Sequence, residues 1–256
     1  HSNLFLHDNG LLYSNGRDKA VTWMNSTYNG RPITPRSGYI VEFNALWYNA
    51  IKFYQQMLSE TPGPENDIYA TECEELAQKL QQSFKNVFLN EHGYLLDYVD
   101  GQMQDWSVRP NQIFAIALDF SPLDIKERKR ILDICTRELV TPKGVRSLSP
   151  KSGGYNPLYV GQQTQRDFAY HNGTAWPWLT GFYLEAYLRI YKMSGVNFIE
   201  RQLIGFEEEL FYHCVGTIPE LFDGNPRFSG RGAISFAMNV SGLLRAINIL
   251  DKYTRE

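Results

Sequence analysis

Four polar segments of the 256-residue chain combine carboxylates or amides with aromatic and basic side chains. They lie within residues 22–49, 105–112, 165–178 and 217–224. Sugar hydroxyls take directional hydrogen bonds from such groups, and the apolar faces of sugar rings can stack on aromatic rings. Glycoside hydrolysis needs one carboxyl group to protonate the leaving oxygen and a second to activate water. The four segments therefore favour a site that binds and cleaves carbohydrate.

The first two segments also have structural explanations. Glu42 stands where a long helical pattern begins, and a negative charge at that end stabilises the helix dipole. Asp105 and Arg109 are near enough in sequence to form a structural ion pair. The guanidinium of Arg109 and the amides of the two residues after Pro110 form a less usual helix start, because they could donate hydrogen bonds to sugar hydroxyls.

The last two segments hold further candidates. His171 lies among Asp, Tyr, Asn and Trp residues, although a single histidine can also be purely structural. A turn at Asp223-Gly224 explains Asp223 but leaves Glu220 unexplained. The sequence contains no metal-binding His spacing and no GxSxG, P-loop or GxGxxG motif. Carboxylates in aromatic loops remain as the candidate chemistry.

Long helical patterns must position these segments. Apolar residues at three- and four-residue spacing, together with turn and capping signals, predict about seven helices. Six of them span about residues 42–59, 65–87, 111–118, 173–193, 197–212 and 233–253. The seventh is capped by residues 121–124 and ends near residue 139. Residues 1–40 and 94–99 favour loops and short strands, and residues 141–168 favour a long functional loop. The absence of a βαβ alternation argues against a parallel sheet.

Composition excludes some classes of partner. The net charge of −3 and the pI near 6.0 argue against a nucleic acid or a membrane surface held by long-range electrostatics. No apolar run approaches 18 residues, so no transmembrane helix is expected. The widely spaced Cys73, Cys135 and Cys214 form no disulfide framework, which favours a reducing, cytoplasmic location. Without an initiating Met or a signal peptide, the chain is expected to be a fragment or a processed product.

Six motifs occur in register along almost the whole chain, from about residue 8 to the end. Together they resemble the glucosidase domain of glycogen-debranching enzymes, the amylo-α-1,6-glucosidase family. The motifs are Trp23-Met24-Asn25, Thr34-Pro35-Arg36, Glu42-Phe43-Asn44-Ala45-Leu46-Trp47-Tyr48-Asn49, Arg109-Pro110-Asn111-Gln112, His171-Asn172-Gly173-Thr174-Ala175-Trp176-Pro177-Trp178 and Pro219-Glu220-Leu221-Phe222-Asp223-Gly224. Each motif alone is modest, whereas six in order are specific.

The resemblance implies an all-α fold, an α/α toroid of six helical hairpins with its active site in loops at one end. It implies inverting hydrolysis of the α-1,6-linked glucose left on a trimmed glycogen branch, an α-glucan as the partner, and no cofactor or metal ion. Glu220 would be the general base, and Asn25 occupies the position of the general acid. The residues expected to bind glucose or to shape the pocket are Trp23, Arg36, Glu42, Asn44, Asp105, Arg109, Asn111, Gln112, His171, Trp176 and Asp223.

The chain departs from the family pattern in two respects. Asn25 stands where the family has an aspartate, and a carboxamide has no proton to give as a general acid. Either Asn25 is an introduced change, or Asp18, Glu42 or Asp105 stands in as the acid. Seven helices are also fewer than twelve, so we expect one domain over residues 1–256 whose toroid is incomplete on the N-terminal side, as in the C-terminal part of a longer protein.

Two other functions fit parts of the sequence. A catalytically silent α-glucan-binding module would keep the sugar contacts and lack the acid. A helical scaffold for another partner would use the polar loops only as helix caps, which leaves the six ordered motifs unexplained.

Overall fold

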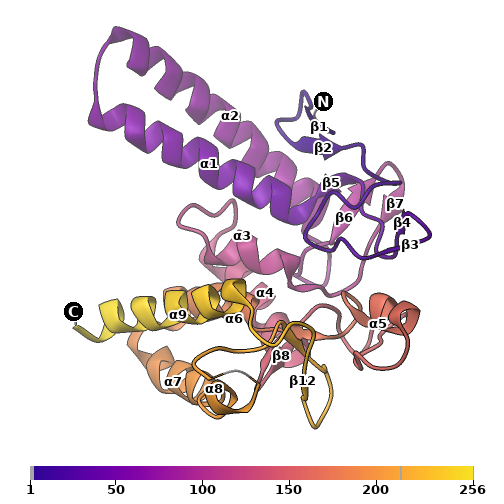
Figure 1. Cartoon of the computed structure of the whole chain (residues 1–256). Helices are drawn as coiled ribbons and strands as arrows, with labels where there is room; N and C mark the ends of the chain where they lie inside the picture. Colours follow the sequence, from indigo (N-terminus) through magenta and orange to yellow (C-terminus); the bar gives the residue numbers. More distant parts are fainter. Residues whose placement is uncertain (1–2, 214, 256) are drawn as a thin grey trace.

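The first two long helices form an antiparallel hairpin at one end of the molecule (Figure 1). The computed structural model describes residues 3–213 and 215–255. Helix α1 (Val41–Glu60) ends at the Thr61–Gly63 turn, and α2 (Pro64–Phe88) begins with a proline at its first position. Proline fits there because its missing N–H would have no partner in the helix. The buried face of the hairpin includes Ala45, Ile51, Leu80 and Phe84.

Two short central helices connect this hairpin to the rest. The 3₁₀ helix η1 (Pro110–Gln112) runs into α3 (Ile113–Ala117), and every residue of α3 is buried. Helix α4 (Ile125–Glu138) follows, with the Asp124 carboxylate accepting hydrogen bonds from the first-turn N–H groups of Lys126 and Glu127, both at 2.8 Å. This cap explains why the helix begins at Ile125. Helix α3 contacts both α1 and α6 (Trp178–Tyr191) and so lies between the two ends of the molecule.

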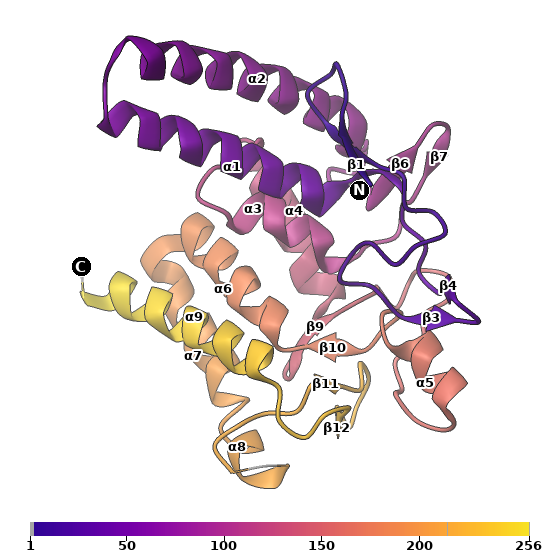
Figure 2. The same ribbon diagram turned by 45° about the horizontal axis from the view of Figure 1, so that its top comes forward.

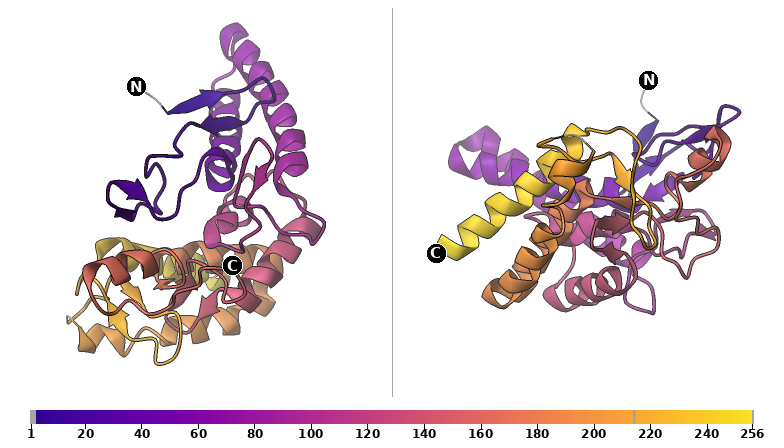
Figure 3. Two further views of the ribbon diagram at one scale, coloured as in Figure 1. Left: turned by 90° about the vertical axis from the view of Figure 1, so that its right-hand side faces the viewer. Right: turned by 60° about the horizontal axis from the view of Figure 1, so that its bottom comes forward.

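The last helices pack around α6. Helix α9 (Ala237–Arg255) lies along α6, as Figure 2 shows, and their backbones meet at Gly181 and Gly242, where a Cβ on either glycine would collide with the other helix. Between them in sequence come the 3₁₀ helix η2 (Lys192–Gly195), α7 (Val196–Ile204) and α8 (Glu209–Tyr212). The described helices form an arc that runs from the α1–α2 hairpin to α7 and α9 (Figure 3).

Short strands carry the loops at one side of this arc. One antiparallel sheet has the order β1-β2-β5-β6-β7, a second the order β12-β11-β10-β9-β8, and β3 pairs with β4 in a two-stranded ribbon. The strands are β1 (Leu4–Leu6), β2 (Leu12–Ser14), β3 (Thr27–Tyr28), β4 (Arg31–Pro32), β5 (Gly38–Ile40), β6 (Tyr98–Asp100), β7 (Met103–Gln104), β8 (Val140–Thr141), β9 (Gly144–Arg146), β10 (Ala175–Trp176), β11 (Leu221–Phe222) and β12 (Gly230–Arg231).

Several sequence predictions need correction. The helical content is confirmed, but an all-α fold is wrong, because two five-stranded sheets and a ribbon hold the polar loops. The helix predicted from residue 173 begins at Trp178, since Ala175 and Trp176 pair with β9 and β11. The helix predicted over residues 197–212 is broken by turns at 205–208 into α7 and α8. The expected loop at 141–168 contains strands β8 and β9 and most of helix α5 (Gln163–Ala169).

The main apolar core joins α1, α2, α3, α4 and α6, and Cys135 is buried within it. Cys135 and Cys73 are both free thiols, whereas Cys214 lies outside the described residues. No helix within residues 3–213 and 215–255 is both long and apolar enough to cross a membrane.

Candidate functional site

The second sheet brings the third and fourth polar segments together. Ala175 on β10 is paired with Phe222 on β11, and Glu220 stands directly before β11. Trp176, the next residue on β10, is paired with Val145 on β9. Segments more than 40 residues apart in sequence therefore meet at this sheet, as the motif spacing alone could not show.

Both carboxylate oxygens of Glu220 are held. The Tyr170 hydroxyl donates to Oε1, and the backbone N–H of Ala233 donates to Oε2 at 2.9 Å. Burial, the hydrogen bond and the charge of Glu220 together raise the pKa of Tyr170, so its hydroxyl stays protonated as a donor. The Glu220 side chain remains partly accessible. A fixed and accessible carboxylate of this kind can accept a proton from water in a defined direction.

An aromatic cluster adjoins Glu220 through Tyr170. The ring of Tyr170 lies 4.9 Å from Trp176 and 4.6 Å from His171, measured between centroids. Trp23 adds the first polar segment to the cluster, with edge contacts of 5.2 Å to His171 and to Trp178. Rings from two segments thus form one wall beside the carboxylate of a third.

His171 is neutral in this wall. Its side chain is buried, and Nδ1 has no hydrogen-bond partner among the described residues. Burial, aided by the positive charges of Arg109 and Arg36, lowers the pKa of His171 to about 3. A neutral imidazole can orient a hydroxyl group but carries no charge at neutral pH.

A buried polar chain supports Trp23. Its indole N–H donates to Asn111 Oδ1 at 2.6 Å, and Asn111 Nδ2 donates to Asp97 Oδ1 at 2.7 Å. Arg36 binds Asp97 through Nε at 2.7 Å and pairs with Glu42 through its terminal nitrogens. Burial opposes the charge of Arg36, but the two carboxylates outweigh it and raise its pKa. The first two motif regions are therefore joined through Asp97, which sequence reasoning missed.

Arg109 does not form the ion pair with Asp105 that the sequence suggested. Its Nη1 donates to the carbonyl oxygens of His171 at 2.8 Å and Ser147 at 3.2 Å. Asp105 Oδ1 instead accepts the N–H of Ser107 at 2.8 Å, and none of the ion pairs within the described chain includes Asp105. The expectation of an ion pair was wrong because the buried guanidinium holds the backbone beneath the aromatic wall.

Two predicted site residues have their polar atoms turned inward. Asn44 is fully buried, accepts from Leu12 N at 2.7 Å and donates to the Leu12 and Ile40 carbonyls at 3.0 Å. Gln112 accepts from Leu95 N at 3.3 Å and donates to Arg109 O at 3.1 Å. These amides hold β2 and the start of η1 in place.

Asp223 organises the loop opposite the aromatic wall. Its Oδ1 accepts the backbone N–H of Tyr159 at 2.8 Å, and its Oδ2 accepts both Nε and Nη2 of Arg231 at 3.0 and 2.9 Å. The Tyr159 ring lies 5.6 Å from Tyr170. Asp223 thus fixes the tyrosine that flanks the Glu220 clamp, and the turn at Gly224 explains only part of its position.

The loop with Asn25 lies against α5. Asn25 is exposed, the Ser26 hydroxyl donates to the Asp167 carbonyl at 2.9 Å, and Tyr28 contacts Phe168 with ring centroids 5.7 Å apart. Figure 2 shows the β3–β4 ribbon beside α5. The loop of Asn25 therefore packs against the helix that leads directly into Tyr170.

The carboxyl groups considered as substitutes for Asn25 differ in their surroundings. Glu42 is buried and paired with Arg36, Asp105 is engaged in a local turn, and Asp18 is exposed in the loop before Trp23. Sequence reasoning overlooked Asp167 as a contact of the Asn25 loop, although its backbone carbonyl accepts the hydrogen bond from the Ser26 hydroxyl. Its position one turn before Tyr170 was the signal in the sequence that could have found it. No group of three or more His, Cys, Asp or Glu side chains among the described residues could hold a metal ion.

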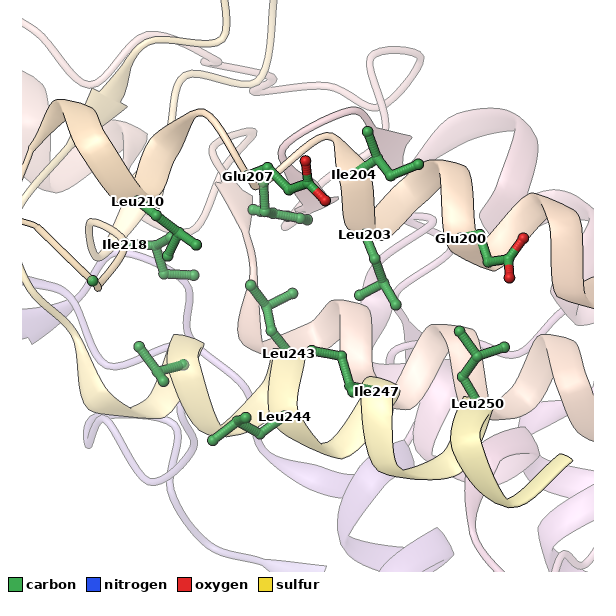
Figure 4. A pocket seen from close by; sticks show the side chains of 13 residues that line it. Glu200, Leu203, Ile204, Glu207, Leu210, Ile218, Leu243, Leu244, Ile247 and Leu250 are labelled. Atoms are coloured by element: carbon green, nitrogen blue, oxygen red, sulfur yellow. The ribbon is translucent and has the colours of Figure 1, made fainter. Parts of the chain in front are cut away.

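An apolar hollow of about 620 Å³ lies away from this site, between α7, α8 and α9 (Figure 4). Leucine and isoleucine side chains from α7 and α9 face one another across it. Among the described residues, Glu200 and Glu207 are the only charged ones that line it, so it does not share the polar character of the Glu220 region.

The sequence matches the family described as amylo-alpha-1,6-glucosidase over residues 3–245. It is 27% identical over 219 residues to the glycogen debranching enzyme of Saccharomyces cerevisiae, and this match covers 70% of this chain but 14% of that protein. The chain therefore corresponds to a small part of that relative.

Solved structures provide two further likenesses. Neutral trehalase from Saccharomyces cerevisiae superposes on 89% of this chain and 42% of its own, with a TM-score of 0.62 and 15% identity. A metal-independent alpha mannosidase from Streptococcus pneumoniae covers 94% of this chain and 57% of its own, with a TM-score of 0.49 and 12% identity. The trehalase likeness shows a shared fold.

Proposed function

The chain belongs to the amylo-alpha-1,6-glucosidase family, and from that premise we propose that it hydrolyses an α-1,6-linked glucose unit of a branched α-glucan with inversion at the anomeric carbon. Membership of this family classes the chain with the glycoside hydrolases. The observation that carries the finer proposal is the Glu220 carboxylate, held by Tyr170 and Ala233 beside an aromatic wall. An inverting reaction needs such a carboxylate to activate the attacking water.

The proposed base acts on water from its partly accessible side. Tyr170 and the Ala233 N–H fix the direction of the carboxylate, because each donates to one of its oxygens. The partly exposed indole of Trp23 forms the proposed surface for the glucose ring, and the buried rings of His171 and Trp176 pack against it.

The remaining predicted binding residues are proposed to shape the pocket. Arg36, Glu42, Asn44, Gln112 and Asp223 would shape the pocket, because their polar atoms are bonded within the protein. Arg109, Asn111 and Asp105 would act similarly through the loops that they hold, with Nε of buried Arg109 still unpartnered. These roles are tested by substituting each residue and measuring both glucan binding and folding of the same variant.

The proposed reaction also needs a general acid that protonates the leaving oxygen. Asn25 occupies the position of the family's aspartate and cannot donate a proton. We expect its carboxamide N–H to donate a hydrogen bond to the glycosidic oxygen, with the proton supplied by solvent. The missing acid at Asn25 also favours the second candidate function, a glucan-binding module without turnover.

Two substrates, a glucosyl-branched dextrin and α-glucosyl fluoride, distinguish the hydrolase from the glucan-binding module. Asn25→Asp should raise glucose release from a glucosyl-branched dextrin by about 10²–10⁴-fold, the usual contribution of a general acid. It should change the hydrolysis of α-glucosyl fluoride little, because fluoride leaves without protonation. Glu220→Gln should lose both reactions. If all three proteins bind oligosaccharide and none releases glucose, the chain is a binding module, and the anomer seen by NMR tests inversion.

The family resemblance also supports proposals about the whole protein. We expect the described arc to be part of an α/α toroid in one domain, completed by helices that lie N-terminal to residue 1 in a longer protein. The expected location is the cytoplasm, and the expected partner is an α-glucan.

A further inference from the structure

A second hollow, of about 450 Å³, lies beside the loop that carries Asn25. Its volume is within the range that small-molecule sites usually occupy. Helix α5 and the loop before it form its walls. The lining side chains are Asn156, Leu158, Val160, Thr164, Gln165 and Phe168. This combination of apolar, aromatic and amide groups differs from the hollow between α7, α8 and α9, whose lining is apolar apart from Glu200 and Glu207.

An exposed aromatic pair stands at this hollow. Phe168 lines it and is 44% exposed, and Tyr28, which contacts Phe168, is 45% exposed. Tyr28 comes from β3, three residues beyond Asn25, while Phe168 comes from α5, two residues before Tyr170. The contact between the two rings therefore joins the loop of Asn25 to the helix that leads into Tyr170.

Polar groups at the hollow are available to a ligand. The side chains of Asn156 and Thr164 form no hydrogen bond with any residue that the structure describes. Asn156 is fixed through its backbone, whose N–H donates to Asn172 O at 2.6 Å. An amide and a hydroxyl held near an aromatic ring match what sugars need, hydroxyl partners on one side and a stacking face on the other.

We propose that this hollow and the Tyr28–Phe168 pair bind a glucosyl unit of the α-glucan chain on the leaving-group side of the cleaved bond. The side follows from the loop of Asn25, because the acid position faces the glycosidic oxygen and the leaving sugar extends beyond it. This inference rests on the proposed function. A glucan occupies the hollow rather than an apolar protein segment, because unpartnered polar side chains line it.

Binding measurements test the subsite without turnover. In Glu220→Gln protein, the dissociation constant of maltohexaose is measured by calorimetry for added Phe168→Ala, Phe168→Leu, Phe168→Trp and Tyr28→Ala changes. Loss of either ring should weaken binding roughly tenfold, which corresponds to 1.4 kcal/mol. Leucine should weaken it as alanine does, whereas tryptophan should preserve it, because stacking needs a ring face. The matched control is Phe53→Ala, which removes an exposed ring from α1, where 54% of the side chain is accessible.

The outcomes separate this inference from the proposed reaction. Unchanged maltohexaose binding in the Tyr28 and Phe168 alanine variants would overturn the subsite, even if Glu220 proves to be the base. Weaker binding in those variants together with a fully active Glu220→Gln protein would support the subsite and reject the proposed base. In the protein with Glu220, Phe168→Ala should raise KM for branched dextrin and leave α-glucosyl fluoride hydrolysis unchanged, since fluoride has no leaving sugar.

Discussion

Replacing Tyr170 by phenylalanine should lower kcat/KM, because it frees one oxygen of the proposed base. The change deletes one hydroxyl and keeps the ring that contacts Trp176 and His171. That hydroxyl donates to Glu220 Oε1, and hydrogen bonds to charged groups contribute about 1.5–3 kcal/mol. Each 1.4 kcal/mol corresponds to a factor of ten in rate, so losing this donor and the fixed direction of the base should lower kcat/KM by about 10- to 100-fold. The Ala233 N–H remains and limits the loss.

The assay should measure kcat/KM for α-glucosyl fluoride, because this substrate needs the base and no acid. Tyr155→Phe is the control, since it removes a hydroxyl that donates to Asn225 at 2.8 Å and not to a carboxylate. A kcat/KM of the Tyr170→Phe protein within about twofold of the unsubstituted protein would refute the role of the Tyr170 hydroxyl.

Three further substitutions test the supporting framework. Arg36→Met should reduce the free energy of unfolding by about 3–5 kcal/mol in urea titrations, because it leaves two buried carboxylates without their cation; a loss below 1 kcal/mol would contradict this. His171, whose pKa is lowered to about 3, should make stability fall by roughly 1 kcal/mol per unit as pH drops from 6.5 toward 3, since only the unfolded state takes the proton. His171→Asn should remove that slope, seen by unfolding at pH 7 and pH 5. Gly224→Ala should cost about 1–3 kcal/mol, because its Cβ would meet the Gly173 carbonyl, and an unchanged melting profile would disprove that contact.

The local spacing of apolar residues and the capping signals were sufficient to predict most helices. The three- and four-residue spacing of apolar side chains located α1 and α2 within a few residues, and the capping signal at Asp124 located the start of α4. These signals are local, because a helix satisfies its own backbone and its cap lies within a few residues. The family motifs likewise suggested Glu220 as the proposed base, because their order in the sequence needs no knowledge of space.

The sheets could not be predicted because their strands are too short to show a pattern. Strands β10 and β11 have two residues each and owe their existence to partners far away in sequence. The same limit hid Asp97. It lies in none of the four polar segments, yet it joins Arg36 to Asn111 inside the fold. Residues that connect motifs need carry no motif of their own.

The two halves of the proposed reaction differ in how far they depend on distant contacts. The Glu220 carboxylate is held by Tyr170 and Ala233 from separate loops, so its orientation depends on the second sheet and α5. Asn25 lies exposed on a loop joined to α5 through Ser26. A single change at Asn25 can therefore remove or restore proton donation without disturbing the base, whereas loss of the α5 contacts should impair both. Separate measurements with fluoride and dextrin substrates resolve these effects, because one substrate needs only the base and the other needs both groups.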